Sequence, residues 1–317
     1  MMHLLVTGAN GFIGKNVVDR MNGMPIPDHL EKVLGGNGSE IFISTTDIEG
    51  VVDIKADLTT ANLPIDQLRR SPVHGVIHLA SSTGVRSFTA DAFTNNVMCT
   101  NNLLNWMRKN EIHFLVNASS SSVYGNTRIM DEASAALPVS DYARSKVKCE
   151  SLIKKWVSEG NIAVNFRIFN AIGRHQRADM LPAVIARHLK SLTGPEGQEE
   201  ELNIFGNRIR SWTYVGDVIN AFWSAVDKFY NAARGTSLTV NLGSVASLTQ
   251  TAMIKAMVEA STVKEAKPNY TNPHPLDLQR TKPDLTRFES LFGWVPNPRN
   301  VDTGITELLN QFGILAA

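Results

Sequence analysis

The chain has 317 residues, 43% of them hydrophobic, so it can bury a large core in one big domain or two modest ones. Its 31 basic side chains nearly balance 30 acidic ones, which gives no reason to expect a nucleic acid or an acidic membrane as partner. The two cysteines, Cys99 and Cys149, stand in no metal-binding or redox spacing and are typical of small helix residues in a reducing compartment.

The start of the chain passes from one short apolar stretch into glycine, without the basic segment of a secretory leader. No run of about eighteen apolar residues occurs in the sequence, so no membrane span is predicted. We therefore expect a soluble, cytoplasmic protein.

The first two-thirds of the chain alternates short β-rich runs with longer helical patterns. Strands are predicted at 3–8, 41–45, 75–80, 113–119 and 163–169, and helices at 13–22, 91–110 and 142–159. The strands are almost continuously apolar, which is typical of parallel strands covered on both faces. The pattern predicts an α/β fold, a Rossmann-type doubly wound parallel sheet built from βαβ units.

Beyond residue 170 the pattern loosens, although a helix at 215–229 and a strand at 239–243 look like further elements of the sheet. Polar connections are predicted at 194–201 and at the Pro- and Asn-rich 267–275. We expect a sheet domain of 1–170 plus 213–246, and a smaller, discontinuous C-terminal lobe of 171–212 plus 247–317.

A glycine-rich turn joins the first predicted strand to the first predicted helix. The stretch LVTGANGFIG places Gly8, Gly11 and Gly14 there. The first glycine allows the tight turn, the second lets a pyrophosphate approach the backbone, and the third lets helix and strand pack closely. With the free N–H groups of the helix N-terminus, this motif predicts a dinucleotide cradle in the sheet domain.

The end of the second predicted strand bears on the choice of dinucleotide. Asp47 would favour NAD if it were the acid that binds the adenosine ribose. Ser44, Thr45 and Thr46 could instead accept a 2′-phosphate, which would allow NADP. No Arg or Lys adjoins these residues, so the sequence favours NAD and leaves NADP open.

Four serines, 119–122, follow the strand at 113–119, and DYARSK places Tyr142 and Lys146 one helical turn apart. A lysine ammonium favours the phenolate form of a neighbouring tyrosine, which is what a general base for an alcohol needs near neutral pH. A serine hydroxyl at the strand end could hold the same substrate oxygen and relay the proton. Together these residues predict a hydride-transfer site.

The order of these motifs resembles that of extended short-chain dehydrogenases/reductases. More narrowly, it resembles their NAD-dependent nucleotide-sugar epimerase/dehydratase family. The resemblance covers nearly the whole chain and rests on TGANGFIG, VIHLAS, SSSSVYG, YARSK, RIFNAIG and LNIFGNRIRSWTYVGDV. It implies an enzyme with a dinucleotide-binding domain and a substrate lobe for a nucleotide-diphosphate sugar.

The resemblance also implies site residues. The catalytic ones are Ser120, Tyr142 and Lys146. The residues expected to bind the cofactor are Gly8, Asn10, Gly11, Phe12, Ile13, Gly14, Thr45, Asp57, Leu58, Leu79, Ala80, Ser81, Asn96, Tyr142 and Lys146. Those expected to bind substrate are Thr83, Ser121, Ser122, Asn170 and Arg210.

Several of these residues have a structural alternative. Arg210 fits a phosphate oxygen because its guanidinium is planar, yet it could be a surface charge. Asn170 could touch the sugar diphosphate or cap a turn. We interpret His78, inside an apolar strand, as a packed core histidine.

The reaction is narrowed by Ser121 and Ser122, which stand where the family's 4,6-dehydratases have an Asp–Glu pair, so elimination of water is disfavoured. The first expectation is an NAD-dependent epimerase that transiently oxidises C4 of an NDP-hexose. The alternatives are an NADPH-dependent 4-keto-sugar reductase and a dinucleotide-binding sensor without turnover.

Members of the family commonly form homodimers, here through helices at about 92–109 and 142–158. Trp106, Leu152 and Trp156 are then either contacts between subunits or internal packing residues.

Overall fold

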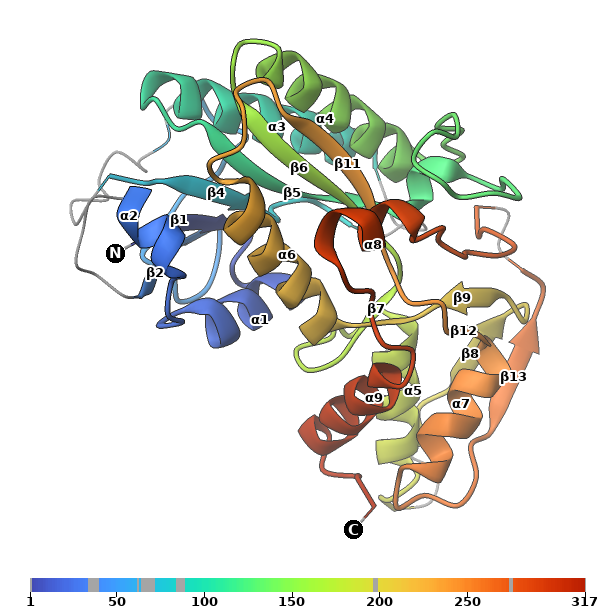
Figure 1. The fold of residues 1–317 in the computed structure, drawn as a ribbon. Coiled ribbons are helices and arrows are strands. Elements are labelled where there is room, and N and C mark those ends of the chain that lie inside the picture. Colours follow the sequence, from blue (N-terminus) through green and yellow to red (C-terminus); the bar gives the residue numbers. More distant parts are fainter. Residues whose placement is uncertain are drawn as a thin grey trace. The chain divides into compact units, whose positions relative to one another are not determined.

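The computed structural model describes residues 2–33, 40–61, 63, 72–83, 89–195, 199–273 and 276–316 (Figure 1). The strands are β1 (Met2–Thr7), β2 (Ile41–Asp47), β3 (Ile54–Lys55), β4 (Gly75–His78), β5 (Phe114–Ser120), β6 (Ile162–Ile168), β7 (Ala171–Ile172), β8 (Leu202–Phe205), β9 (Ile209–Ser211), β10 (Thr213–Tyr214), β11 (Ser237–Leu242), β12 (Ser247–Thr249) and β13 (Pro268–Thr271). The α-helices are α1 (Phe12–Met21), α2 (Asp28–Val33), α3 (Ala90–Lys109), α4 (Asp141–Val157), α5 (Leu181–Ser191), α6 (Val215–Phe229), α7 (Gln250–Glu259), α8 (Thr286–Phe292) and α9 (Asn300–Gln311), and a 3-10 turn, η2, spans Ser121–Tyr124.

The chain divides into two compact units. Unit 1 comprises Met1–Gly125, Glu132–Arg167 and Ile219–Val240. Unit 2 comprises Asn126–Asp131, Ile168–Val218 and Asn241–Ala317. The cofactor and substrate roles expected for the two parts of the chain stay predictions.

A seven-stranded parallel sheet in the order β11-β6-β5-β4-β1-β2-β3 organises unit 1. β1 pairs in parallel with β2 on one side, where Leu4 faces Ile43, and with β4 on the other, where Leu4 faces Gly75. The expected doubly wound α/β fold is confirmed. Strand order reverses between β1 and β4, and ligands of such sheets bind beyond the carboxyl ends of the strands at this reversal.

Helices α3 and α4 lie side by side over one face of the sheet, and α1 and α6 lie over the other (Figure 1). Both α3 and α4 begin at a side-chain cap. The side chain of Thr89 accepts a hydrogen bond from the Ala92 N–H, and that of Ser140 accepts one from the Ala143 N–H. Such caps satisfy N–H groups that have no partner inside the helix, so they define where each helix starts.

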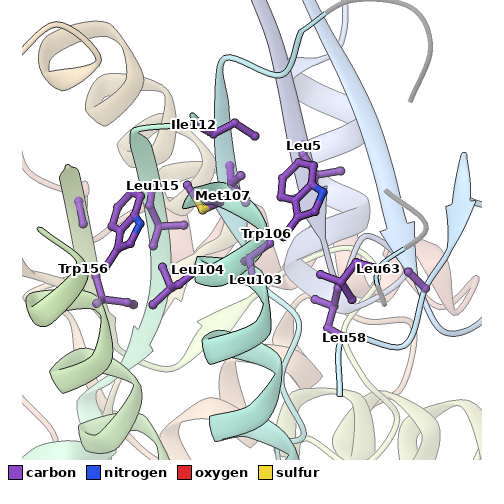
Figure 2. Packing of buried hydrophobic residues seen from close by; sticks show 14 of the residues in the cluster. Leu5, Leu58, Leu63, Leu103, Leu104, Trp106, Met107, Ile112, Leu115 and Trp156 are labelled. Atoms are coloured by element: carbon purple, nitrogen blue, oxygen red, sulfur yellow. The ribbon is translucent and has the colours of Figure 1, made fainter. Parts of the chain in front are cut away.

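The layer between these two helices and the sheet is a hydrophobic cluster (Figure 2). Trp106 of α3 is 8% exposed and Trp156 of α4 is fully buried, and both pack there with Leu104 and Leu115. Leu152 is partly buried against the same cluster. Of the two interpretations offered for these tryptophans and Leu152, the structure therefore supports internal packing.

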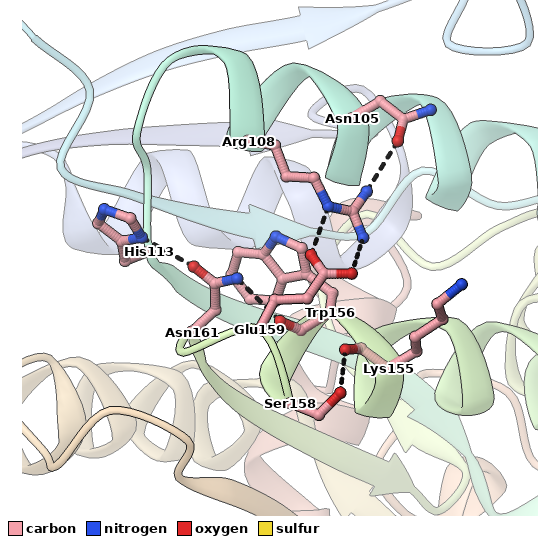
Figure 3. A network of polar contacts seen from close by, with 8 residues as sticks. All are labelled: Asn105, Arg108, His113, Lys155, Trp156, Ser158, Glu159 and Asn161. Carbon is pink, nitrogen blue, oxygen red and sulfur yellow. Dashed lines mark hydrogen bonds and ion pairs between the residues drawn. The ribbon is translucent and has the colours of Figure 1, made fainter.

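Polar contacts join the far ends of α3 and α4 (Figure 3). Arg108 donates from Nε and Nη2 to the two carboxylate oxygens of Glu159, at 2.6 and 2.9 Å. This pairing holds the pKa of Glu159 below its ordinary value. Asn161 donates to the Trp156 carbonyl at 2.8 Å and shares a hydrogen bond of 2.7 Å with His113. These contacts set how α3 and α4 end, about four turns from the first turn of α4.

Unit 2 holds three two-stranded sheets, β10-β7, β12-β9 and β13-β8, with α5, α7 and α9 packed around a core of their own. The interpretation of 267–275 as a connection is wrong for 268–271, because β13 forms there and pairs in parallel with β8. Proline is tolerated at the first residue of a strand, and Tyr270 and Thr271 are strand-forming residues.

The six strands predicted from the sequence all form, with bounds within two residues, and the helix at 215–229 forms at those bounds as α6. Besides β13, the strands and α-helices that were not predicted are α2, β3, β7 to β10, β12, α5 and α7 to α9. Part of the predicted connection at 194–201 lies outside the described residues. Among those described, no helix combines the length and apolar character needed to cross a membrane.

Candidate functional site

The glycine turn lies at the point where strand order reverses. Gly8 has a φ of +70°, and a Cβ there would come within 2.6 Å of the Ala80 backbone nitrogen. A Cβ on Gly14 would collide with the Gly8 carbonyl oxygen, so helix α1 packs close against the turn. Gly11 is exposed and precedes α1, and it leaves the helix N-terminus open to an anion. Phe12 is buried in the first turn of α1, and Ile13 is half-buried.

A buried threonine, Thr7, holds the loop that follows β4 by hydrogen bonds. The Thr7 hydroxyl accepts hydrogen bonds from the N–H groups of Leu79 and Ala80, both at 3.2 Å. His78 shares hydrogen bonds with Thr7, at 2.8 Å, and with Thr100, at 3.2 Å. Burial lowers the pKa of His78 to about 3, with Lys146 acting in the same direction, so the ring is neutral. The interpretation of His78 as a packed core histidine is confirmed.

Carboxylates gather at the end of β2. Asp47 accepts a hydrogen bond of 3.0 Å from the Asn10 N–H, and the Asn10 side chain donates to the Glu49 carbonyl. The hydroxyl of Thr45 donates to Asp53 at 2.9 Å and accepts from the Asp53 N–H at 2.9 Å. A 2′-phosphate brought to Thr45 would therefore meet the Asp53 carboxylate, which favours NAD over NADP.

Asp57 and Leu58, both expected to bind the cofactor, have local structural contacts. The Asp57 carboxylate accepts hydrogen bonds from the Thr59 N–H, at 2.8 Å, and from its hydroxyl, at 2.7 Å. The Leu58 side chain is buried in the cluster of Figure 2, and its carbonyl accepts a hydrogen bond from Asn102 at 3.0 Å.

Asn96 connects the loop after β4 to the first turn of α4. Its Oδ1 accepts from the Ser82 N–H at 2.7 Å, and its Nδ2 donates to the Ser82 carbonyl at 3.0 Å and to the Ser145 hydroxyl at 3.1 Å. Ser145 in turn donates to the Tyr142 carbonyl at 2.8 Å. In the same loop Ser81 and Thr83 are half-buried, and the Ser81 hydroxyl donates to the Ser82 carbonyl at 3.2 Å.

The predicted catalytic residues come from the last residue of β5 and the first two turns of α4. The Lys146 ammonium donates to the Ala118 carbonyl on β5 at 3.0 Å and lies 5.8 Å from the centre of the Tyr142 ring. Ser120, the last residue of β5, is half-buried, and its hydroxyl accepts a hydrogen bond of 2.9 Å from the Ser122 hydroxyl. Ser121 is buried in the same turn. Unit 1 thus brings together a phenol, an ammonium and serine hydroxyls.

The two predicted phosphate and sugar contacts belong to unit 2. The Asn170 amide donates to the Ser211 carbonyl at 3.1 Å and to the Thr281 hydroxyl at 3.2 Å. Arg210, on β9, donates to the carbonyl of Ile209 at 3.0 Å. Ile209 also forms a bridge with Arg280, so a second arginine lies on the chain segment beside β9.

Sequence reasoning missed Thr7, Ser145, Glu150 and Arg167. Thr7 precedes the glycine turn directly, and Ser145 and Glu150 flank Lys146 on α4, so proximity to the motifs was a usable signal for these three. Arg167 begins the motif RIFNAIG, but nothing in that motif indicates a buried ion pair with Glu150. Within the described residues, no group of His, Cys, Asp and Glu side chains is arranged to hold a metal ion.

The model of the NAD dependent epimerase/dehydratase family matches residues 4–243. The chain therefore belongs to this family of enzymes, which couple NAD to chemistry at a substrate. It is 27% identical over 320 residues to an uncharacterized UDP-glucose epimerase of Bacillus subtilis, covering 93% of each chain. It is 26% identical over 336 residues to a UDP-glucuronate 4-epimerase of Thermodesulfobacterium geofontis, covering 98% of this chain and 96% of the relative.

Among solved structures, the protein MoeE5 in complex with UDP-glucuronic acid and NAD has a TM-score of 0.78 and 25% sequence identity, covering 97% of this chain and 98% of that one. The residues present here fit NAD. The exposed Gly11 opens the N-terminus of α1 to a pyrophosphate, and the acidic end of β2 suits a ribose with a free 2′-hydroxyl.

Proposed function

We propose that the protein is an NAD-dependent nucleotide-sugar 4-epimerase that acts on a UDP-hexose. The arrangement at the start of α4 carries the proposal. The Lys146 ammonium, held by the Ala118 carbonyl, lies 5.8 Å from the centre of the Tyr142 ring, and Ser120 ends the strand that supplies this carbonyl. These are the groups needed to move a proton to and from an alcohol oxygen.

In this proposal Tyr142 removes the proton from the 4-hydroxyl of the sugar, with the positive charge of Lys146 5.8 Å from the centre of its ring. NAD would be held by the glycine turn at Gly8 and Gly11 and by the acidic end of β2, and it would supply the hydride acceptor and donor for C4. Ser120 holds the oxygen at C4 as it becomes a carbonyl. The keto sugar turns over, and Tyr142 gives its proton back when the other face of C4 is reduced.

The UDP-sugar part of the proposal is supported by two relatives and one neighbour. They are described as epimerases of UDP-glucose and UDP-glucuronate and as a complex with UDP-glucuronic acid. We assign Asn170 and Arg210 to the diphosphate, where a guanidinium can pair with phosphate oxygens. Ser121 and Ser122 supply no carboxylic acid to eliminate water, which favours epimerisation over dehydration.

A direct test starts from the protein as purified. It is denatured to identify any dinucleotide that it releases, and the native protein is incubated with UDP-glucose, UDP-glucuronic acid and UDP-N-acetylglucosamine, followed by NMR. We expect released NAD and a 4-epimer of at least one sugar, with no net use of cofactor. Consumption of NADPH only with 4-keto sugars would make the protein a reductase. Bound dinucleotide without any conversion would make it a sensor.

We also propose a homodimer, on the resemblance alone, through the helices at 92–109 and 142–158. Light scattering at micromolar concentration tests this, and a monomer would refute it.

A further inference from the structure

The four consecutive serines have different surroundings. Ser119 donates to the Glu150 carboxylate at 2.5 Å. Ser120 is approached twice by one residue: the Ser122 hydroxyl donates to its Oγ at 2.9 Å, and the Ser122 N–H donates to the same atom at 3.2 Å. The 3-10 turn η2, which begins directly after Ser120, folds Ser122 back into this position.

A serine hydroxyl has one proton to donate and two lone pairs that accept. In Ser120 both lone pairs receive hydrogen bonds from Ser122. The remaining capacity of Ser120 is its own proton. Toward any further group Ser120 therefore acts as a donor.

We propose that Ser122 is a positioning residue that makes Ser120 an obligatory donor to the oxygen at C4 of the sugar, an inference that rests on the proposed epimerase function. A sugar hydroxyl that accepts from Ser120 must direct its own proton elsewhere, and the base assigned to take it is Tyr142. The hydrogen bonds then run in one direction, from Ser122 to Ser120, to the sugar oxygen and to Tyr142. Ser120 does not accept the substrate proton, so the relay role expected for it from the sequence is replaced by that of a fixed donor.

The direction of these hydrogen bonds has its largest effect on the reaction when C4 is oxidised. A carbonyl oxygen accepts hydrogen bonds and cannot donate, so a donor held in place binds the keto form and the transition states next to it better than the alcohol. Without the Ser122 hydroxyl, the Ser122 N–H still donates to Ser120, but one lone pair of Ser120 can accept from the sugar, and that orientation does not stabilise the developing carbonyl. Loss of the Ser122 hydroxyl is thus expected to lower kcat and leave KM unchanged.

The experiment compares S122A, S122T, S120A and the double variant S120A/S122A with the unaltered protein, using the epimerised sugar found above. We expect S122A to lower kcat about 3- to 10-fold, as for one neutral hydrogen bond, with KM within about twofold. S122T keeps a hydroxyl and restores kcat. In the S120A background, S122A has no further effect, because Ser122 acts through Ser120. The control is S151A, which removes an exposed hydroxyl from α4 that bonds its own helix.

Three results would overturn the inference: an unchanged kcat in S122A, a rise in KM alone, or independent losses that add in the double variant. The second and third would mean that Ser122 touches the sugar itself. Calorimetric binding of UDP and urea unfolding of S122A check that the fold and the nucleotide site are intact, and S122T supplies the answer if S122A unfolds. If the unaltered protein converts none of the sugars, the epimerase function itself fails. If it converts one and S122A is unaffected, only the role of Ser122 fails.

Discussion

Arg167 of β6 and Glu150 of α4 form a two-pronged ion pair inside unit 1, with Nη2–Oε2 at 2.8 Å and Nε–Oε1 at 3.1 Å. Both side chains are largely buried, 9% and 13% exposed. Glu150 also accepts from Ser119 of β5, and the Arg167 guanidinium lies 4.8 Å from the centre of the Tyr124 ring in η2. The pair therefore joins the strand and turn that carry the serines to the helix that carries Tyr142.

Removing one partner of this ion pair is expected to lower the free energy of unfolding more than replacing both partners. E150Q leaves the Arg167 charge buried without its partner, so we expect the free energy of unfolding to fall by about 3–5 kcal/mol. The double variant E150Q/R167M removes both charges and should lose less than E150Q alone. Urea unfolding of the unaltered protein, E150Q, R167M and E150Q/R167M measures the difference. A double variant as unstable as the sum of the single changes would mean that the two side chains do not interact.

Acid should destabilise the protein through His78. Its pKa is about 3 in the folded protein, lowered by burial from an ordinary 6.5, so below pH 6.5 the unfolded chain binds a proton that the folded chain does not. The stability that His78 contributes is present above pH 6.5 and is lost as the pH falls toward 3. H78Q should therefore show a shallower fall in urea midpoint between pH 7.5 and pH 4.5. The control is H29Q, at a side chain that is 59% exposed, and it should keep the slope of the unaltered protein. An H78Q slope equal to that of the unaltered protein would contradict the burial argument.

Variants can test the roles assigned to Tyr142 and Lys146, with a second lysine on the same helix as a control for the change in charge. We expect Y142F to lower kcat about 10²- to 10⁴-fold, because it removes the group that exchanges the substrate proton. K146M should also lower kcat, since it removes the positive charge beside the group that exchanges the proton. The control is K148M, which removes an exposed lysine from the same helix and should leave kcat unchanged. If Y142F were fully active, Tyr142 would not be the base, and another residue would have to take that role.

Cofactor choice is expected to depend on Asp53, which shares hydrogen bonds with Thr45 at the end of β2. D53N removes a negative charge from the place where a 2′-phosphate would lie. We expect it to improve the affinity for NADP relative to NAD by about fivefold, or roughly 1 kcal/mol. Titration of both dinucleotides by fluorescence measures the ratio of the two Kd values. D19N makes the same change of net charge on the exposed face of α1 and should leave the ratio unaltered.

The elements that could be predicted from the sequence are those with a local signal. Buried parallel strands are continuous apolar runs, and the Gly8 turn needs a residue that accepts a φ of +70°, so both are visible in the chain itself. Strand β13 was missed because it forms by pairing with β8, more than sixty residues away, and its own composition is that of a loop.

The candidate site likewise has features that the sequence predicts and contacts that it does not. Tyr142 and Lys146 are one turn apart, so their proximity is a property of the helix. The contacts that position them join residues distant in the chain: Asn96 reaches Ser145, and Glu150 reaches Arg167. Such pairs depend on how α3, α4 and β6 pack, and periodicity carries no information about that.

The three hydrogen bonds of the Asn96 amide limit which residues can replace it during evolution. Its oxygen accepts and its nitrogen donates in one orientation only, so Asp at this position would set a carboxylate oxygen against the Ser82 carbonyl, and Leu would leave Ser82 and Ser145 without their bonds. Residues of equal size therefore offer no intermediate step. A lineage that gives up Asn96 has to rebuild the loop after β4 and the first turn of α4 together.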